Sequence, residues 1–478
     1  MWYLSSKNSM DIALTDSNVS LTYQEMGAAI QDRREWLESL GVGRVGIALD
    51  NQVEWVLFDL ACQGAGICCV PAPSFFSQKQ LEHLVTESGI ELLICSNGVE
   101  SGIFCPSEET PFKTIYSQKI KHVQDAQMPE GTSKVTFTSG STGAPKGVCL
   151  SEESQLNVAR SLVDAIAIDS VKHLCILPFA VLLENIAGVY APLMVGGTVV
   201  TKRADELGFV GSKLISPEKL LYQISVEQPN SLILVPELLN VLVMACSKGW
   251  QPPKSLLFVA VGGGKVSSKL IHQAKSFGLP VYQGYGLSEC ASVVSLNTPD
   301  NDLESSAGHA LPHTSVEVID HELVVRENLF LGYLNKPESF YPNAFYTGDL
   351  VSLENNTLSI IGRKKNLMIN SFGRNISPEW LEAELMATRM MRSVMVFGDD
   401  RPHCGGVFVP ITDDISDEQI QQSVEKLNES LPDYAQIKVW FKSERLFESL
   451  PHCVTPSGKL IRKAILDHFE QDIDQLYL

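Results

Sequence analysis

One loop of the sequence, VTFTSGSTGAPKGVC at residues 135–149, has residue types suited to binding phosphate. Gly140 and Gly143 let the backbone approach a ligand closely, and Lys146 supplies a positive charge for polyphosphate oxygens. Four side chains add hydroxyl donors: Thr138, Ser139, Ser141 and Thr142. The loop predicts a polyphosphate-binding turn after a short apolar strand, and its composition alone leaves a plain surface turn open.

The spacing of this loop differs from the common nucleotide P-loop, G-x-x-x-x-G-K-[ST]. Pro145 precedes Lys146 where that pattern has glycine, and Gly147 follows it where the magnesium-binding hydroxyl belongs. A kinase or ATPase of the P-loop class is therefore disfavoured.

A second segment, YQGYGLSE at residues 282–289, carries groups for an aromatic ring and a metal ion. Gly284 and Gly286 would admit a flat ring against the backbone, and Tyr285 would stack on it. Glu289 is a hard oxygen ligand of the kind that Mg²⁺ prefers. The alternative for this segment is a strand-to-turn junction with an ordinary surface glutamate.

Three further segments contain candidate binding residues: Gly263 and Gly264, Asp349, and Lys459. For Asp349 and Lys459, the alternative to a binding role is a solvated turn or a charged helix face. Gly263 and Gly264 end an apolar run in a turn that would allow close contact with a nucleotide base. Asp349, in FYTGDL, would accept hydrogen bonds from ribose hydroxyls. Lys459 follows a Ser-Gly turn, in TPSGKLIRKAI, at the start of a short amphipathic helix.

Elements of alternating type must position these segments. Helical spacing of apolar residues predicts helices over residues 21–40, 54–66, 75–88, 217–225 and 267–277, and a helix with Ser377 as its cap and Pro378 in its first turn. Short apolar runs predict buried strands over residues 42–49, 67–70, 92–95, 135–138, 174–177, 198–201, 231–235 and 256–261. The alternation indicates an α/β fold of stacked βα units around mostly parallel sheets.

Length and composition narrow the function classes. At 478 residues the chain exceeds one ordinary domain, and its net charge of −19 argues against nucleic acid as a partner. The 11 cysteines show no C-x-x-C spacing, so a disulfide framework or a zinc site is not expected. We expect a cytoplasmic protein, because the sequence shows no export signal and no apolar run of about 20 residues that would span a membrane.

Five motifs in order resemble those of the adenylate-forming superfamily: TSGSTGAPKG, YQGYGLSE, YTGDL, GRKKN with a glycine shortly after it, and PSGK. This superfamily includes acyl- and aryl-CoA synthetases, firefly luciferase and the adenylation domains of nonribosomal peptide synthetases. The resemblance extends from SLTYQEM to PSGKLIRK and is closest in motif style to fatty and long-chain acyl-CoA synthetases. It implies a large AMP-binding domain, residues 1–365, a hinge at Asn366, and a small mobile α/β domain, residues 366–478.

The resemblance also implies a role for each motif. The Ser/Thr/Gly loop with Lys146 would hold the ATP phosphates, and Glu289, preceded by Ser288 where relatives often have Thr, would hold Mg²⁺. Lys459 would bridge the carboxylate and the α-phosphate. The remaining implied positions are Gly263, Gly264, Gly284, Tyr285 and Gly286 for adenine, Asp349 and Arg363 for ribose, and Gly373 for the thiol-transfer step.

The segment LPFAVLLEN resembles LP-x-A-H-x-x-E of long-chain acyl-CoA synthetases, with Val181 at the gate position. The predicted acyl pocket consists of Val181, Leu182, Ile186, Ala187 and Gly284. Residues 191–197 lack the aspartate that amino-acid-activating relatives have in F-D-x-S, so an α-amino acid is disfavoured. The alternative is that this apolar helix belongs to the core.

The resemblance predicts an AMP-forming ligase that activates a fatty or other apolar acid with ATP and Mg²⁺. The acyl group would then pass to CoA or to the phosphopantetheine of a separate carrier protein. Two alternatives stay open: an adenylating enzyme for an aryl or natural-product acid, and an inactive homologue that only binds.

Overall fold

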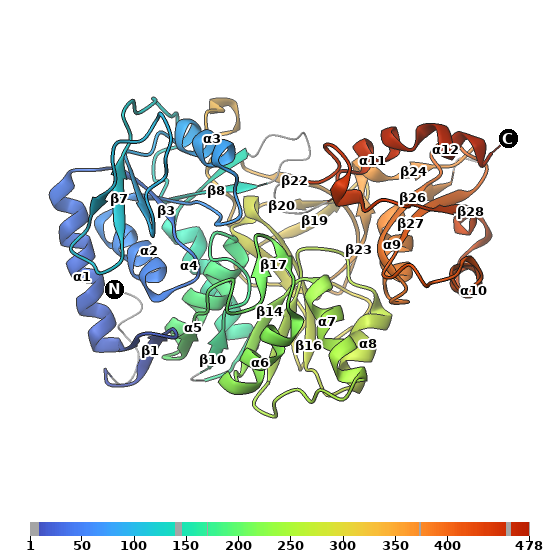
Figure 1. Cartoon of the computed structure of the whole chain (residues 1–478), viewed down its shortest axis with the longest axis horizontal. Coiled ribbons are helices and arrows are strands. Elements are labelled where there is room, and N and C mark those ends of the chain that lie inside the picture. The colour runs from blue at the N-terminus through green and yellow to red at the C-terminus, as the bar shows by residue number, and fades with distance from the viewer. Residues whose placement is uncertain (1–8, 139–145, 170, 372–373, 456–459, 478) are drawn as a thin grey trace.

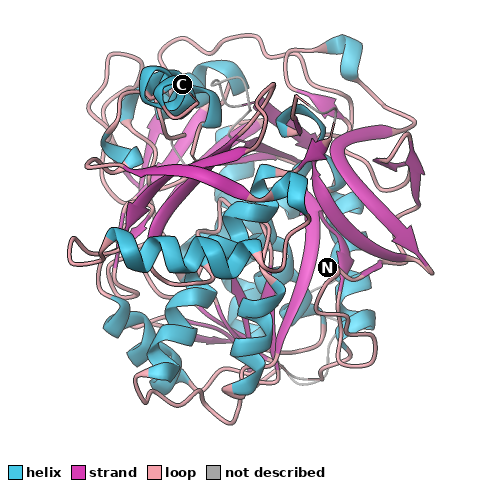
Figure 2. Ribbon diagram, turned by 90° about the vertical axis from the view of Figure 1, so that its right-hand side faces the viewer, coloured by secondary structure: helices cyan, strands magenta, loops and turns pink. Residues whose placement is uncertain are grey.

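The computed structural model describes residues 9–138, 146–169, 171–371, 374–455 and 460–477. Two large sheets, of eight and thirteen strands, form most of the chain, and a three-stranded sheet lies near its C-terminal end. In Figure 1 the orange and red segments from α9 onward group at one end of the molecule, opposite the blue N-terminal segments, with the green helix α8 beside α9. Figure 2 shows helices packed around both large sheets. The predicted α/β fold is confirmed.

The eight-stranded sheet contains the strand that leads into the phosphate-binding loop. Its order is β21 (Gly332–Tyr333), β9 (Lys146–Leu150), β8 (Lys134–Thr138), β4 (Cys68–Pro71), β3 (Arg44–Ala48), β5 (Leu92–Cys95), β7 (Tyr116–Lys119) and β6 (Glu108–Glu109). The strands from β8 to β5 pair in parallel and the outer pairs are antiparallel. The crossover helices are α2 (Val53–Ala65), between β3 and β4, and α3 (Gln78–Ser88), between β4 and β5, while α1 (Tyr23–Leu40) leads into β3 from the other large sheet. Left-handed glycines at Gly41, Gly66 and Gly89 end these three helices.

The thirteen-stranded sheet is parallel in its middle and antiparallel at its ends. Its order is β19 (Val316–Ile319), β20 (Glu322–Val325), β22 (Phe345–Glu354), β23 (Thr357–Arg363), β18 (His309–Ala310), β17 (Ser292–Leu296), β16 (Val281–Leu287), β15 (Phe258–Val261), β14 (Ser231–Leu234), β10 (Lys172–Leu174), β11 (Thr198–Val200), β1 (Ile12–Thr15) and β2 (Ser20–Thr22). The strands from β16 to β1 are parallel.

Helices cover both faces of this sheet and bury separate cores. The helices α6 (Pro217–Glu227), α7 (Pro236–Ser247) and α8 (Ser268–Ser276) share a core with β14 and β15. A second core joins α4 (Glu152–Ile166), the π-helix η2 (Glu184–Tyr190) and α5 (Ala191–Met194) to α1 and α2. Of the helices that the described residues form, none is both long enough and apolar enough to cross a bilayer.

The segment after residue 363 has its own cores. Its elements are η5 (Lys364–Asn366), β24 (Met368–Ile369), β25 (Asn375–Ile376), α9 (Pro378–Met386), β26 (Met391–Phe397), β27 (Cys404–Pro410), α10 (Asp417–Asn428), β28 (Ile437–Lys442), α11 (Arg462–His468) and α12 (Glu470–Gln475). Two hydrophobic cores contain only residues from 368 onward, and the other four contain only residues up to 360. The boundary between residues 365 and 366 stays a prediction.

The predicted strand at residues 174–177 is wrong in its position, because β10 covers Lys172–Leu174. Side chains form hydrogen bonds with the backbone amide and carbonyl of Leu177, which a longer strand would need for pairing. The Glu184 carboxylate accepts from the Leu177 amide at 3.0 Å, and the Asn51 amide donates to the Leu177 carbonyl at 2.8 Å. The sequence analysis also missed α4, α7 and the antiparallel strands from β17 to β23.

Candidate active site

Most of the predicted site residues line one cavity of about 2280 Å³. They come from strands far apart in sequence, β8, β9, β16, β22 and β23, from the short helices η2, η3 (Ser288–Cys290) and η5 (Lys364–Asn366), and from the segments just before η2 and just after β15. The predicted residues in its walls are Thr138, Lys146, Val181, Leu182, Ala187, Gly263, Gly264, Gly284, Tyr285, Gly286, Ser288, Glu289, Asp349, Arg363 and Asn366. The predictions for Ser139, Gly140, Ser141, Thr142, Gly143, Gly373 and Lys459 lie outside the described residues.

Strand pairing brings the start and the end of the phosphate-binding loop together. Thr138 of β8 lies opposite Lys146 of β9 in an antiparallel pair. The Lys146 ammonium lies 5.3 Å from the centre of the Tyr333 ring, a cation–π contact. Tyr333 is placed there because β21 pairs with β9, with Tyr333 opposite Val148. The lysine is therefore held at the cavity wall by an aromatic ring.

Tyr333 also connects this lysine to the predicted metal ligand. Its hydroxyl donates to the Glu289 carboxylate at 2.8 Å. Burial raises the pKa of Tyr333, and the nearby Glu289 charge raises it further, so the phenol stays protonated and remains a donor. The sequence analysis did not identify Tyr333, which lies 44 residues from Glu289 in a segment without polar motifs.

The predicted ribose-binding carboxylate lies in a network of three side chains. Asp349 and Arg363 are opposite each other on β22 and β23, with 2.7 Å between Nε and the carboxylate. The Tyr285 hydroxyl donates to the same carboxylate, also at 2.7 Å. Burial raises the pKa of Asp349, while Arg363 and Tyr285 lower it. The network orients Tyr285, whose hydroxyl the sequence analysis assigned no role.

The glycines of the predicted adenine site serve different purposes. A β-carbon at Gly286 would lie 1.9 Å from the Ser292 carbonyl oxygen on β17. The structure therefore requires glycine there for the pairing of β16 with β17. Gly286 also lines the cavity, and its predicted contact with a ligand ring stays a prediction. Gly263 has φ of +78° in the turn after β15, a conformation in which side chains are strained.

Four of the five residues of the predicted acyl pocket line the cavity: Val181, Leu182, Ala187 and Gly284. Their contact with an acyl group stays a prediction. Leu183, Ala187, Ala191 and Val195, spaced four residues apart, form one stripe along the cavity wall. Ile186 is fully buried in the core on another side of the helix, so it does not line the cavity. The segment is a π-helix, and its wider turn changes which residues share a face compared with an α-helix.

A buried ion pair ties this π-helix to the phosphate strand. Lys134, at the start of β8, lies 2.8 Å from the Asp59 carboxylate of α2, and both side chains are almost completely buried. Tyr190 donates to Asp59 at 2.7 Å, and the Lys134 ammonium contacts Tyr190 at 2.9 Å. Asn185 donates to the same carboxylate at 3.0 Å. Two residues of the π-helix are thus fixed relative to the strand that carries the phosphate loop.

The predicted hinge lies where α8 and α9 meet. The Asn366 amide donates to Glu379 at 2.6 Å, which anchors η5 to the first turn of α9. Lys269 of α8 forms an ion pair with Glu384 of α9 at 2.9 Å, and Ser267 donates to the same carboxylate at 3.1 Å. Arg389, just after α9, also donates to Gln273 of α8 at 2.7 Å. Lys269 is largely exposed, so its ion pair with Glu384 contributes well under the energy of a buried pair.

Comparison with known proteins gives family and fold. The sequence model for AMP-binding enzymes matches residues 5–331, and that for the AMP-binding enzyme C-terminal domain matches residues 365–478. A curated 2-succinylbenzoate–CoA ligase from Staphylococcus epidermidis is 25% identical over 482 residues, covering 96% of this chain and 95% of its own.

Two solved structures share the fold. One is an anthranilate CoA ligase, AuaEII, in complex with anthranoyl-AMP, with a TM-score of 0.81 and 16% identity over 98% of this chain and 95% of that one. The other is an O-succinylbenzoate coenzyme A synthetase from Bacillus subtilis with ATP and magnesium, with a TM-score of 0.73 and 22% identity over 97% of this chain and 98% of that one.

Proposed function

The chain belongs to the AMP-binding enzyme family of adenylate-forming enzymes and is an AMP-forming acid–thiol ligase, and we propose that it activates an aromatic carboxylic acid and transfers it to CoA. The observation that carries the proposal is the single cavity that joins the phosphate-strand residues, the Asp349 network and an apolar wall. The similarity to a 2-succinylbenzoate–CoA ligase and to an anthranilate CoA ligase supports an aryl acid. This favours the aryl alternative over the fatty acid expected from the sequence.

The first half-reaction joins the acid carboxylate to the α-phosphate of ATP and releases pyrophosphate. In this proposal Lys146 neutralises charge on the departing phosphates, and Tyr333 keeps both Lys146 and Glu289 in place. Asp349 binds the ribose hydroxyls, and Tyr285, fixed by Asp349, packs against the adenine. Catalysis consists mainly of positioning and charge neutralisation.

The donor set at Glu289 fits a magnesium ion. Its carboxylate lines the cavity beside Lys146, and one carboxylate with substrate phosphates and water is a common Mg²⁺ environment. When bound, the ion would neutralise phosphate charge as pyrophosphate leaves. Glu289 would hold it, with Tyr333 orienting the carboxylate.

A fatty acid is the second candidate. The stripe of Leu183, Ala187, Ala191 and Val195 is aliphatic, with small residues at its centre that leave room for an extended chain. The acceptor could also be a carrier-protein phosphopantetheine, which presents the same thiol.

The test compares half-reactions with aryl and alkyl acids. We expect pyrophosphate release with ATP and an aryl acid, and a CoA thioester once CoA is added. Lys459→Ala should abolish adenylate formation but still transfer a supplied acyl-adenylate to CoA. Lys248→Ala, at the end of α7, is the control and should retain both steps. An enzyme that releases pyrophosphate only with alkyl acids would overturn the aryl assignment, and a protein that releases none would be an inactive homologue.

A further inference from the structure

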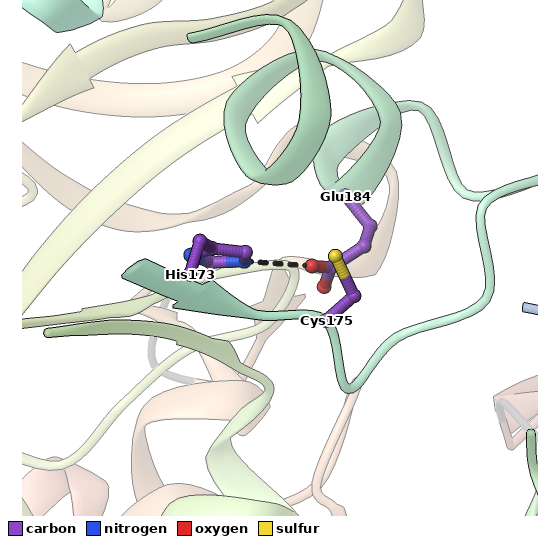
Figure 3. A group of neighbouring side chains, drawn as sticks. All are labelled: His173, Cys175 and Glu184. Carbon is purple, nitrogen blue, oxygen red and sulfur yellow. Dashed lines mark hydrogen bonds and ion pairs between the residues drawn. The ribbon is translucent and has the colours of Figure 1, made fainter. Parts of the chain in front are cut away.

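A buried polar relay lies against the cavity wall, formed by residues of β10, β14 and the π-helix η2. His173 of β10 and Glu184 of the π-helix are 2% and 0% exposed, with 2.9 Å between Nε2 and the carboxylate (Figure 3). A β-carbon at Gly188 would lie 2.4 Å from the Glu184 oxygen and 2.8 Å from Nε2, so glycine is required beside the pair. Both His173 and Ser231 are part of the cavity lining.

Hydrogen bonding sets the direction of this relay. One Glu184 oxygen accepts from the Leu177 amide at 3.0 Å and the other contacts His173 Nε2. An ionised carboxylate only accepts hydrogen bonds, so its second hydrogen bond comes from Nε2–H. In the neutral imidazole the other ring nitrogen, Nδ1, is then the acceptor, and the Ser231 hydroxyl donates a hydrogen bond to it at 2.8 Å. The lone pairs of the Ser231 oxygen remain available to accept.

Cys175 completes a group that could in principle hold a metal, since ligand atoms of His173, Cys175 and Glu184 lie within 4.8 Å of one another (Figure 3). All three side chains already have hydrogen-bonding partners. The Cys175 thiol donates to the Gly188 carbonyl at 3.6 Å, and Glu184 accepts from the Leu177 amide and contacts His173. We therefore interpret the group as a hydrogen-bond relay.

Sheet geometry places the relay far from the nucleotide end of the cavity. Ser231 pairs with Phe258, and Tyr282 pairs with Ala260, two residues further along β15. Ser231 and Gly284 are therefore separated by four residues along the strands, about 13 Å, and by two strand spacings, about 10 Å. Together these give roughly 16 Å between the two ends of the cavity floor.

Resting on the proposed ligase function, we infer that the cavity ends in a hydrogen-bonding subsite for a hydroxyl or amino group carried far from the acid's carboxylate. Ser231 accepts from that group, and His173 and Glu184 are positioning residues that keep the serine oxygen an acceptor. The wall between the two ends is apolar, so the body of the acid is apolar as well. The substrate class is an elongated acid with an apolar body and a distal hydrogen-bond donor.

Equilibrium binding tests the subsite without relying on turnover. The probes are two series of ω-arylalkanoic acids of increasing chain length, one with a para-hydroxyl on the ring and one without. Calorimetric titration should give a preference of about tenfold for the hydroxylated acid, the value of one good hydrogen bond, at the length that spans about 16 Å and not at shorter lengths. Ser231→Ala should remove that preference and leave the affinity for the unsubstituted acid unchanged.

Two further variants serve as controls for this binding experiment. Ser247→Ala, an exposed serine whose hydroxyl donates within α7, should keep the full preference. Glu184→Gln should reduce the preference, because the amide can donate to Nε2 and turn Ser231 from acceptor to donor. Equal affinity for both series at every length, or a preference that survives Ser231→Ala, would overturn the inference. So would Zn²⁺ binding that Cys175→Ser abolishes.

The test of the subsite can fail without the proposed ligase function failing, and the reverse also holds. Pyrophosphate release with unsubstituted acids and no hydroxyl preference would leave the ligase assignment intact and remove the subsite. Hydroxyl-dependent binding without pyrophosphate release would keep the subsite and contradict the ligase assignment.

Discussion

The contact between Tyr333 and the predicted metal ligand leads to a quantitative prediction. Tyr333→Phe keeps the ring under Lys146 and removes only the hydroxyl that donates to Glu289 at 2.8 Å. A hydrogen bond to a charged group contributes about 1.5 to 3 kcal/mol. The Mg²⁺ concentration for half-maximal pyrophosphate release should therefore rise at least about tenfold, since 1.4 kcal/mol corresponds to a factor of ten.

A second substitution separates the two contacts of Tyr333. Tyr333→Leu also removes the ring, and an exposed cation–π contact contributes about 0.5 to 1 kcal/mol. Its apparent affinity for ATP should fall a further twofold to fivefold at saturating Mg²⁺. Tyr341→Phe is the control, because that exposed hydroxyl reaches only toward the Glu130 carbonyl, at 3.3 Å. An unchanged Mg²⁺ dependence in Tyr333→Phe, with the fold intact, would refute the role assigned to the hydroxyl.

Three further predictions concern stability and selectivity. Lys134→Met should lower the free energy of unfolding in urea by about 3 to 5 kcal/mol, because it leaves the Asp59 charge buried and unpaired. Adding Asp59→Leu should recover part of this loss. A loss below about 1 kcal/mol in Lys134→Met would contradict the importance of the ion pair. Burial lowers the pKa of His313 to about 4, so the unfolded chain binds the proton first as the pH falls. This contribution to stability is complete above about pH 6.5 and is lost, by about 3 kcal/mol, as the pH falls to about 4. His313→Gln should flatten the pH dependence of the free energy of unfolding in urea over that range. Ala187→Leu should favour shorter acids in competition assays, by about 1 to 3 kcal/mol per methylene excluded, and an unchanged length profile would place the pocket elsewhere.

Much of the architecture followed from local patterns. The strand β5 has the predicted bounds, and the bounds of α1 and α2 lie within two residues of the predicted ones. These elements could be predicted because apolar periodicity and a glycine at the helix end are visible within a short stretch of sequence. The residue types at the phosphate strand, at Glu289 and at Asp349 likewise indicated the cavity that the structure brings together.

What could not be predicted depends on contacts between distant segments. Tyr333 reaches Glu289 and Lys146 only because β21 pairs with β9, about 185 residues away along the chain. Ile186 was assigned to the pocket because it is apolar, but the packing of the π-helix buries it in the core. Lys134 and Asp59 looked like ordinary charged residues, and their burial follows from how β8 packs against α2.

The central claim is that this chain forms an acyl-adenylate and passes the acyl group to CoA. Mass spectrometry of one reaction containing ATP, Mg²⁺, CoA and an aryl acid tests it directly. The account predicts AMP, pyrophosphate and acyl-CoA in equal amounts, and acyl-adenylate accumulating when CoA is left out. ADP and phosphate as the nucleotide products, or an acyl-CoA formed without AMP, would contradict it.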